Sequence, residues 1–398
     1  MKEIFVTGMG ILSALGTGKG EALAALKEKR SGIAPLRYLE TSHTEYPVGE
    51  VKLSNTEMMQ MLDIPAGGIT TRSSLMGMIA VREALAQAEI REKGRRRMAL
   101  ISGTTVGGMD MSERYYKDFL DNDARNAYIS THDCGTCTEM IADYSGFFSF
   151  VAAISTACSS AANAILTGAE LIRDGRADVA VVGGSECLTK FHLNGFSSLM
   201  ILDREPCKPF DAHRGGLNLG EGAAFLVLEA EESFSKRQGV QPLCKLSGYA
   251  NACDAYHQTA SSPQGDGARF SMLEALGRAG LSPGDISYIN AHGTGTGNND
   301  LSEGMAIREI FQGAVPPISS TKAFTGHTTS AAGGIEAVIS ILALLHGFIP
   351  ANLHFSTPME ELSFLPSAGE EPVAPLKHVL SNSFGFGGND TSLIFSQL

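Results

Sequence analysis

The 398-residue chain contains no tryptophan, and aromatic residues make up only 7% of it. Basic residues are also scarce: 31 Lys and Arg stand against 43 Asp and Glu, which gives a formal net charge of −12. Such a negative chain argues against nucleic acid or an anionic membrane as its main partner. A negative net charge does not exclude a local basic patch that binds an acidic protein.

A disulfide framework is missing as well. The seven cysteines are an odd number without regular spacing, at positions 134, 137, 158, 187, 207, 244 and 253. Scattered free thiols fit a reducing cytoplasm, which is the expected location. Cys134 and Cys137, with His132 nearby, resemble half a zinc site, but no second pair follows, so we expect no bound metal.

Membrane and export signals are equally lacking. The longest apolar run, residues 335–349, contains Glu336 and His346 and is too short to span a bilayer. Near the N-terminus, Thr7 and two glycines interrupt the apolar residues, unlike a signal peptide. What the chain does contain is 43% hydrophobic residues and 45 glycines, a globular composition with many tight turns and close backbone contacts.

Strand-like and helix-like segments alternate along the chain. A short strand at 4–6 is followed by an expected glycine turn at Gly8–Gly10, and the pattern restarts after a charged segment at 231–242. This alternation predicts a mostly parallel sheet covered by helices on both faces. We place the boundary between an N-terminal half, residues 1–236, and a C-terminal half, residues 237–398.

One cysteine lies at a joint between a strand and a helix. The apolar run 150–154 leads to Cys158, and helical spacing follows from Ala161 to Leu171. A helix start offers unpaired N–H groups and a positive dipole end, which favour the nucleophilic thiolate. Most free cysteines are simply buried small residues, so on this stretch alone a structural cysteine is the favoured interpretation.

Two histidines lie in comparable settings. His292 follows an expected strand in a Gly- and Thr-rich turn, and His327 precedes a helix of small residues, as Cys158 does. This repeat of a reactive side chain before a helix of small residues indicates two related halves whose equivalent helices meet at the centre. Because sites form at the carboxyl ends of parallel strands, a cysteine and two histidines there favour catalysis.

Other segments supply charge and backbone donors. Lys322 lies five residues before His327, and Gly385-Phe-Gly-Gly388 offers free N–H groups of the kind an oxyanion hole needs. The loop 203–222 is dense in paired charges and glycines, so we expect it to form a buried turn network.

Five segments, in order along the chain, resemble motifs of the β-ketoacyl-acyl-carrier-protein synthases, condensing enzymes with a Cys-His-His centre. They are Thr156-Ala-Cys158-Ser-Ser-Ala, Pro209-Phe-Asp-Ala-His-Arg214 with Gly220-Glu-Gly-Ala, His292-Gly-Thr-Gly-Thr-Gly-Asn-Asn-Asp300-Leu-Ser-Glu303, Lys322-Ala-Phe-Thr-Gly-His327 and Asn382-Ser-Phe-Gly-Phe386-Gly-Gly388. The resemblance runs from about residue 4 to 396, and the ordered set is far more specific than any single motif.

The resemblance implies an α/β, thiolase-like fold with a duplicated αβαβα five-layered architecture, in which each half is a five-stranded sheet with helices. It also implies a homodimer, or a heterodimer with a related ketosynthase-like subunit. Acyl-carrier protein and malonyl-acyl-carrier protein would be the substrate-bearing partners. No cofactor is implied, because the phosphopantetheine arm belongs to the carrier protein.

The implied reaction is a decarboxylating Claisen condensation in fatty-acid or polyene/polyketide chain elongation. Cys158 would take the acyl group, and a malonyl thioester would lose CO₂ and attack the acyl-cysteine. His292 and His327 would be neutral donors to the enolate oxygen, with Lys322 holding His327 neutral and in position. The N–H groups of Cys158 and Phe386 would form the oxyanion hole.

The resemblance implies further roles. Thr294 and Thr296 would contact the phosphopantetheine arm, Phe386 would gate the acyl pocket, and Val106 would limit chain length from the partner's half-site. Glu303 would be a structural acid and a candidate cation ligand. The expected substrate-binding residues are Thr294, Thr296, Phe384, Phe386, Val106 and Phe196, and the expected carrier-protein rim is Arg72, Arg204 and Lys208.

Three departures from the family pattern mark a divergent member. Ser330 stands where glycine or alanine is common, Gly295 and Gly297 stand where serine and proline are usual, and Asn389-Asp390 replaces Thr-Asn. None of these changes removes a catalytic group.

Other functions remain as alternatives. A non-catalytic partner subunit that determines chain length typically lacks the cysteine that this chain has. A thiolase would need a second cysteine as base in a C-terminal glycine motif, and a cysteine hydrolase would have no use for paired histidines.

Overall fold

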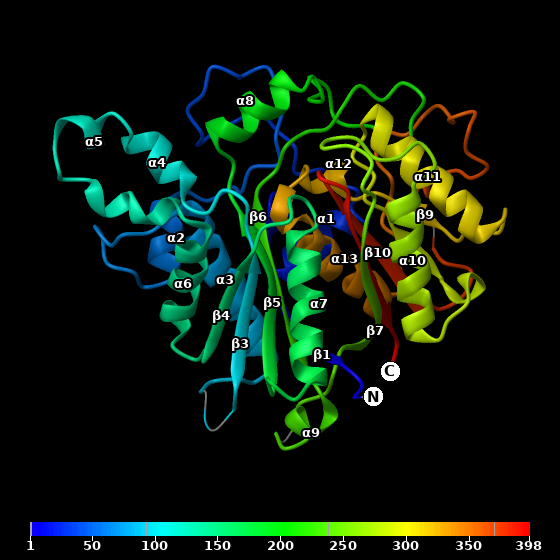
Figure 1. Ribbon diagram of the computed structural model, residues 1–398, viewed down its shortest axis with the longest axis horizontal. Helices are drawn as coiled ribbons and strands as arrows, with labels where there is room; N and C mark the ends of the chain where they lie inside the picture. The colour runs from blue at the N-terminus through cyan, green and yellow to red at the C-terminus, as the bar shows by residue number, and fades with distance from the viewer. Residues whose placement is uncertain (1, 93, 95, 238, 370) are drawn as a thin grey trace.

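The computed structural model describes residues 2–92, 94, 96–237, 239–369 and 371–398. Its centre is one mixed sheet with the strand order β4-β3-β5-β6-β1-β7-β11-β10-β8-β9, and the short β2 pairs with β1 (Figure 1). The strands are β1 Phe5–Ser13, β2 Gly16–Thr17, β3 Met98–Gly103, β4 Phe150–Ile154, β5 Val179–Glu186, β6 Gly222–Glu229, β7 Cys244–Cys253, β8 Tyr288–Asn290, β9 Ile318–Ser319, β10 His378–Gly385 and β11 Asn389–Ser396.

The sheet consists of two stretches with the same topology. In β1-β6-β5-β3-β4 the first two pairings are antiparallel and the next two parallel, and β7-β11-β10-β8-β9 repeats this pattern. The stretches join where Phe5 pairs with Lys245 and Val6 with Cys244. The fold is therefore duplicated. The division at 236/237 stays a prediction, and Gln238 of the expected linker lies outside the described residues.

The expectation of a mostly parallel sheet was wrong, because each half ends in antiparallel strands. β10 and β11 are joined by the short glycine loop 386–388, and so short a connection can only form a hairpin. Parallel pairing is confined to β3 with β4 and β5, and to β8 with β9 and β10, where long crossovers that include helices connect the strands.

Helices form the layers around and between the two stretches. α7 packs on β3 and β5, α13 packs on β6 and β10, and the two helices contact each other in the middle. On the outer faces, α3 covers β1 and β6, and α10 covers β7 and β11. The helices are α1 Lys19–Lys27, α2 Asn55–Met61, α3 Arg72–Gln87, α4 Met109–Tyr115, α5 Asp118–Asp121, α6 Cys134–Ser145, α7 Ser160–Arg173, α8 Lys190–Ser198, α9 Glu231–Phe234, α10 Asp266–Ala279, α11 Gly297–Phe311, α12 Lys322–Thr325 and α13 Ala332–His346.

Short 3-10 turns complete the chain. They are Asn126–Tyr128, Ser130–His132, Pro283–Asp285 and Thr329–Ala331. The last of these leads directly into α13, and the segment Thr329–His346 is long and apolar enough for a membrane span by length and composition. Most of that segment is buried inside the protein, so it is the central helix of the core. The chain termini lie together at one end of the molecule, opposite α8 (Figure 1).

The expected turn at Gly8–Gly10 was also wrong, because β1 runs straight through it. A Cβ on Gly8 would lie 2.2 Å from the carbonyl oxygen of Ala84, and a Cβ on Gly10 would lie 2.0 Å from that of Ala80. These glycines therefore allow helix α3 to approach the strand closely instead of turning the chain.

Candidate active site

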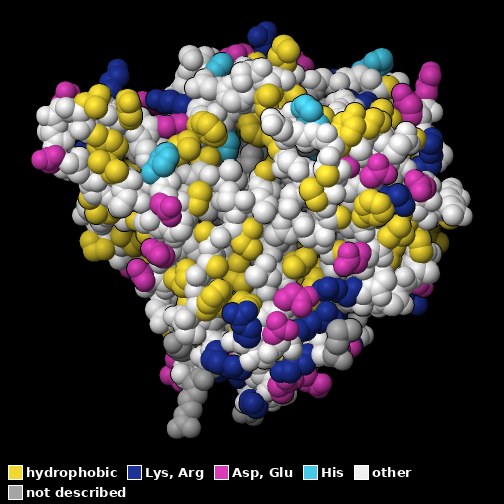
Figure 2. All heavy atoms as spheres, in the orientation of Figure 1, with side chains coloured by type: hydrophobic (Ala, Val, Ile, Leu, Met, Phe, Trp, Pro, Cys, Tyr) yellow, Lys and Arg dark blue, Asp and Glu magenta, His cyan; other side chains and the backbone are white. Residues whose placement is uncertain are grey.

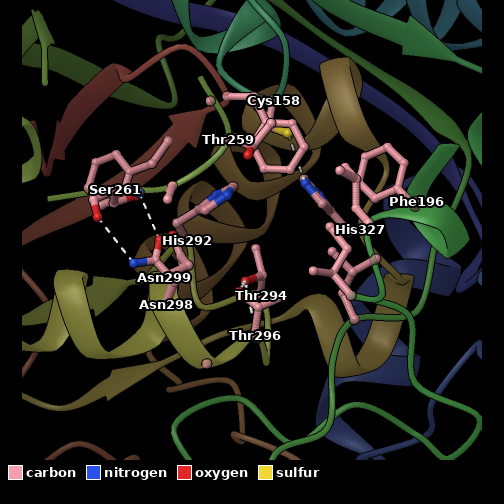
Figure 3. Close-up of a pocket in the computed structure, with 18 of the residues that line it drawn as sticks. Cys158, Phe196, Thr259, Ser261, His292, Thr294, Thr296, Asn298, Asn299 and His327 are labelled. Atoms are coloured by element: carbon pink, nitrogen blue, oxygen red, sulfur yellow. Dashed lines mark hydrogen bonds between the residues drawn. The ribbon is translucent and has the colours of Figure 1, made fainter. Parts of the chain in front are cut away.

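Cys158 lies between β4 and α7, as the sequence predicts. Ala157, the residue before it, has a φ of 52°, a left-handed conformation that non-glycine residues seldom adopt. This sharp bend turns the Cys158 side chain toward the middle of the molecule, where it faces His327 (Figure 3). The thiol is 5% exposed, and Ser159 is the N-cap residue of α7.

The thiol is held protonated in the resting site, contrary to the expectation from its place before a helix. Burial raises the pKa of Cys158 to about 12, although the charge of Lys322 and the backbone N–H of Phe386 pull it downward. Cys158 Sγ lies 3.0 Å from Nε2 of His327. The proton therefore has an acceptor within hydrogen-bond distance when the sulfur attacks.

The two histidines lie together beside the thiol. Their ring centroids are 5.3 Å apart and the rings are nearly perpendicular, at 84°. Phe384 lies against His292, with 5.8 Å between ring centroids. Burial lowers the pKa of both histidines well below the usual value, and the charge of Lys322 lowers each further. Both imidazoles are therefore neutral.

The charge of Lys322 lowers the pKa of His327, as expected, but the side chain contacts His292 instead of positioning His327. Its Nζ donates to the carbonyl oxygen of His292 at 2.6 Å and lies 3.3 Å from Nδ1 of the same ring. A lysine at Nδ1 leaves the ring proton on Nε2, which makes His292 a fixed Nε2 donor. Nδ1 of His327 has no hydrogen-bond partner among the described residues. The motif places Lys322 next to His327 in sequence, but the turn through α12 separates them in space.

Two buried carboxylates hold this arrangement. Glu336 on α13, which sequence reasoning did not select, pairs with Lys322, and burial raises its pKa to about 7. Its place as a lone acid in an otherwise apolar helix could have identified Glu336 from the sequence. Glu303 on α11 accepts the backbone N–H groups of His292 and Gly293 and the side-chain amide of Asn382. It anchors the turn that carries His292.

A cavity of about 180 Å³ leads to these groups. The buried Cys158, His292 and His327 line it (Figure 3), and so do Phe384 and Phe386. The expected residues Thr294, Thr296 and Phe196 also line it, as do residues that sequence reasoning missed: Leu199, Ile201, Leu217, Thr259, Ala260, Ser261, Asn298 and Asn299. Asn298 and Asn299 lie at the start of α11 inside the motif that begins with His292, whereas the other missed residues come from segments far apart in the sequence, so no local pattern identifies those.

The apolar side of this cavity is closed by two aromatic rings. Phe196 of α8 and Phe386 of the glycine loop are stacked, with 5.9 Å between centroids. Val106 does not line this cavity. Its side chain lies in an apolar cluster of the N-terminal half, and its N–H donates to Glu186. Its expected role in a partner's half-site stays a prediction.

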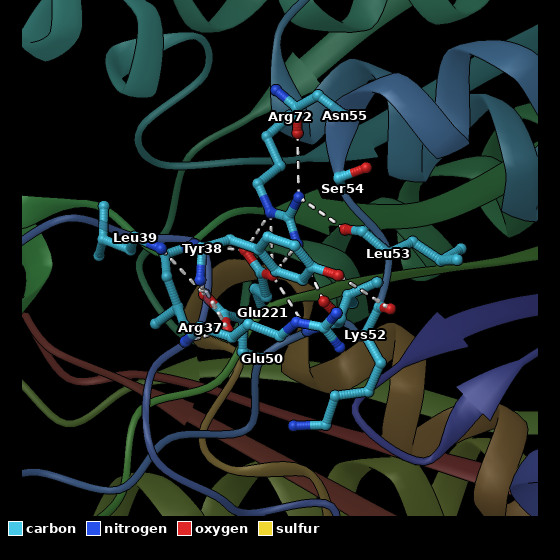
Figure 4. Close-up of polar contacts among 12 residues, drawn as sticks. Arg37, Tyr38, Leu39, Glu50, Lys52, Leu53, Ser54, Asn55, Arg72 and Glu221 are labelled. Carbon is cyan, nitrogen blue, oxygen red and sulfur yellow. Dashed lines mark hydrogen bonds and ion pairs between the residues drawn. The ribbon is translucent and has the colours of Figure 1, made fainter.

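The expected rim residue Arg72 is not at the surface. It is only 8% exposed, and its guanidinium donates to Glu221, to Asn55 and to the carbonyl oxygens of Val51 and Leu53 (Figure 4). Arg72 therefore ties residues 51–55 to Glu221, which directly precedes β6, because a desolvated guanidinium needs this many acceptors.

The other two rim residues have different positions. Arg204 is exposed and Lys208 is half-buried, on the loop that follows the lining residue Ile201. The loop 203–222 is a turn network, but it is buried only in part. Arg214 donates to the backbone carbonyl oxygens of Asp211, Thr296 and Gly297, and Asp211 and residues 216–222 are buried, whereas Arg204 is exposed.

The cysteine pair on α6 has ordinary structural contacts. Cys134 Sγ bonds the carbonyl oxygen of Thr105, Cys137 is buried, and His132 contacts Ser112. Within the described ranges, no group of three or more His, Cys, Asp or Glu side chains is arranged to hold a metal ion.

The duplicated sheet, with a cysteine and two histidines between its halves, defines a thiolase-like ketosynthase fold, as the sequence predicts. The chain belongs to the β-ketoacyl synthase family. Residues 1–233 match the family described as "Beta-ketoacyl synthase, N-terminal domain", and residues 243–356 match "Beta-ketoacyl synthase, C-terminal domain".

Named relatives cover the whole chain. It is 32% identical to 3-oxoacyl-[acyl-carrier-protein] synthase 2 of Staphylococcus aureus (strain COL) over 412 residues, which is 100% of this chain and 98% of the relative. Among solved structures, the ishigamide ketosynthase/chain length factor superposes with a TM-score of 0.90 at 28% identity, covering 100% of this chain and 99% of that one. A ketosynthase in complex with its chain length factor from Xenorhabdus doucetiae gives 0.84 at 31% identity, covering 100% and 98%.

Proposed function

We propose that this chain catalyses the decarboxylating condensation of an acyl-cysteine with a malonyl thioester carried by acyl-carrier protein. The observation that carries the proposal is the 3.0 Å contact between Cys158 Sγ and His327 Nε2, two residues that line the cavity. A chain length factor need not hold such a nucleophile and base in contact, so the contact favours the catalytic role over the non-catalytic one.

Acylation is the first step. Cys158 Sγ attacks the thioester carbon of an acyl-carrier protein, its proton passes to Nε2 of His327, and the carrier thiol leaves with that proton. The backbone N–H of Phe386 already points at the sulfur. It and the N–H of Cys158 bind the developing oxyanion.

Decarboxylation and condensation follow. The malonyl thioester loses CO₂, and the electron pair of the broken C–C bond forms an enolate at the thioester oxygen. His292 donates a hydrogen bond from Nε2 to the enolate oxygen, because Lys322 occupies its Nδ1. His327 has no described partner at Nδ1, so either tautomer is open to it: Nε2 accepts a proton in acylation, and in the Nε2-protonated tautomer it donates a hydrogen bond to the enolate oxygen here. The enolate carbon then attacks the acyl carbon and Cys158 leaves as thiolate.

Charges on the rim support docking of a carrier protein. Arg204 and Lys208 follow the lining residue Ile201 in sequence and are at least partly accessible. In the proposed complex they pair with acidic side chains of the carrier protein, while Thr294 and Thr296 contact its arm. Charge reversal at both positions raises KM for the carrier-bound substrate and leaves turnover of a small thioester unchanged.

A second subunit is part of the proposal. β4 is an edge strand of the sheet, its sequence Phe-Val-Ala-Ala-Ile has no charge, and Phe150 is 45% exposed. Hydrophobic side chains spread over the surface where β3, β4 and α7 lie, while charged ones gather toward the end with the termini (Figures 1 and 2). An uncharged open edge is a template for pairing. The occupant is a second copy or a related subunit, as in the pair from Xenorhabdus doucetiae.

Intact-mass measurement tests the proposal. Wild type, Cys158→Ala and Cys253→Ala are incubated with acyl-carrier proteins of several chain lengths and then with malonyl-carrier protein. Cys253 is an exposed free cysteine outside the cavity, so its variant controls for non-specific acylation. We expect an acyl adduct on wild type and on Cys253→Ala, absent from Cys158→Ala and discharged as a β-ketoacyl product. No adduct from any donor contradicts catalysis by this chain alone and points to an obligate partner subunit or to the non-catalytic role.

A further inference from the structure

We propose that Asn389 is a positioning residue that ties the oxyanion-hole loop, residues 385–388, to the start of the helix that carries Cys158. The inference rests on the proposed acyl transfer, because it assigns a task in the geometry of that step. Asn389 is the first residue of β11 and follows the loop directly. It is also one of the positions where this chain departs from the family pattern.

The side-chain oxygen of Asn389 accepts hydrogen bonds from three donors. Ser159 Oγ, Asn163 Nδ2 and Asn251 Nδ2 each lie 2.7 Å from it. An amide oxygen has two lone pairs, so three donors at this distance saturate it. The donors come from the N-cap of α7, from the second turn of α7 and from β7.

Two of these bonds cross between the duplicated halves. Ser159 is the neighbour of Cys158, and Asn163 lies one turn further along α7. Asn163 is only 8% exposed and is itself held on both sides, because it donates to Thr156 Oγ1 at 2.9 Å and accepts from Thr391 Oγ1 at 2.8 Å. Asn389 therefore meets a rigid partner, and not a mobile surface side chain.

The loop 385–388 needs a side-chain contact to hold its conformation, because its glycine backbone can adopt many others. Gly387 and Gly388 both have positive φ, at 83° and 74°. Two backbone bonds hold the loop to its own half: the N–H of Gly387 donates to the carbonyl oxygen of Gln258, and that of Asp254 donates to the carbonyl oxygen of Gly388. Neither bond fixes the loop relative to Cys158.

This side-chain contact affects the distance between the two N–H groups of the proposed oxyanion hole. One belongs to Cys158, in the N-terminal half, and the other to Phe386, in the C-terminal half. Their separation is set by how the halves meet at this point. The bonds of Asn389 to Ser159 and Asn163 hold that contact next to the loop, and the bond of Thr391 to Asn163 holds it two residues further along β11. A threonine, usual in the family here, has its acceptor one bond closer to the backbone and reaches less far toward α7.

The test compares Asn389→Leu, which keeps the size but removes the acceptor, with Asn389→Thr, which restores a shorter one. Two reactions of Cys158 are measured: acylation by an acyl thioester of N-acetylcysteamine, which needs the oxyanion hole, and alkylation by iodoacetamide, which does not. Amide hydrogen exchange of residues 384–391 is followed in parallel.

We expect Asn389→Leu to lower kcat for acylation about tenfold to a hundredfold, because small displacements of an oxyanion donor have effects of this order. KM and the alkylation rate should stay within about threefold, exchange in 385–388 should become faster, and Asn389→Thr should recover part of kcat. An equal loss of alkylation, or unchanged exchange in the loop, overturns the proposal. If wild type is not acylated by any donor, the proposed function fails, while the exchange measurement still decides whether Asn389 holds the loop.

Discussion

At the scale of single residues, burial sets the protonation of the site. The same loss of solvent keeps His292 and His327 neutral and Cys158 protonated. Neutral imidazoles suit hydrogen-bond donation to an enolate, whereas the thiol needs a base in contact. In the proposed reaction His327, 3.0 Å from the sulfur, is that base, so the proposal does not need a low thiol pKa.

Lys322 allows a direct test of the assignment to His292. Its removal frees Nδ1 of His292 and leaves Glu336 as an unpaired buried acid, so we compare Lys322→Met/Glu336→Gln with Glu336→Gln alone. We expect CO₂ release from malonyl-carrier protein to fall about a hundredfold in the double variant, while acylation of Cys158 falls far less. Release of CO₂ and intact mass measure the two steps. Equal losses in both steps would contradict the assignment.

Asp390 makes stability depend on pH. Burial, with Asp254 and Glu303 nearby, raises its pKa from 3.8 to about 8. Between these values the folded state keeps a proton that the unfolded state loses, so stability falls as pH rises through this window. Asp390→Asn removes this titration. Its stability relative to wild type should therefore increase by roughly 4 kcal/mol between pH 5 and pH 9, because about three pH units separate pH 5 from the folded pKa.

Urea unfolding at both pH values measures this difference. Asp118→Asn, on α5 where no residue is buried, is the control, and it should give the same difference from wild type at each pH. A pH-independent effect of Asp390→Asn would refute the role of its titration.

At the scale of elements, the contact between β1 and α3 depends on a missing side chain. We expect Gly10→Ala to lower the free energy of unfolding by about 1–3 kcal/mol, because its Cβ would overlap the Ala80 carbonyl oxygen. Gly20→Ala in α1 is the matched control. It meets no atom within 4 Å and should be neutral or stabilising by up to about 1 kcal/mol, from better helix propensity. Similar effects of both variants in denaturant unfolding would disprove the packing argument.

At the scale of the whole molecule, the open β4 edge should govern assembly. We expect Phe150→Asp with Ala153→Glu to weaken subunit association at least about tenfold, because both changes put desolvated charge into the pairing face. Phe270→Asp, an exposed aromatic residue on α10, is the control and should leave association unchanged. Sedimentation velocity over a concentration series measures the dissociation constant. Unchanged association in the double variant would place the interface elsewhere.

The sequence predicted most of the elements, and the reason is local. Helix α7, expected from Ala161 to Leu171, spans Ser160–Arg173, because its apolar spacing lies within the segment itself. Strand direction was not predictable, since the turn that reverses β10 into β11 looks like any glycine-rich loop. Gly8 and Gly10 likewise resemble turn residues until the helix that covers them is known.

The sequence by itself determined the family and the candidate reactive groups, because cysteine, histidine and lysine in ordered glycine-rich motifs carry a chemical signature that folding does not change. Only the tertiary structure decided which group touches which. Lys322 is close to His327 along the chain but bonds His292, and Arg72 is charged but buried against Glu221. Contacts of this kind depend on distances between segments far apart in sequence, and those distances are set by how the two halves pack.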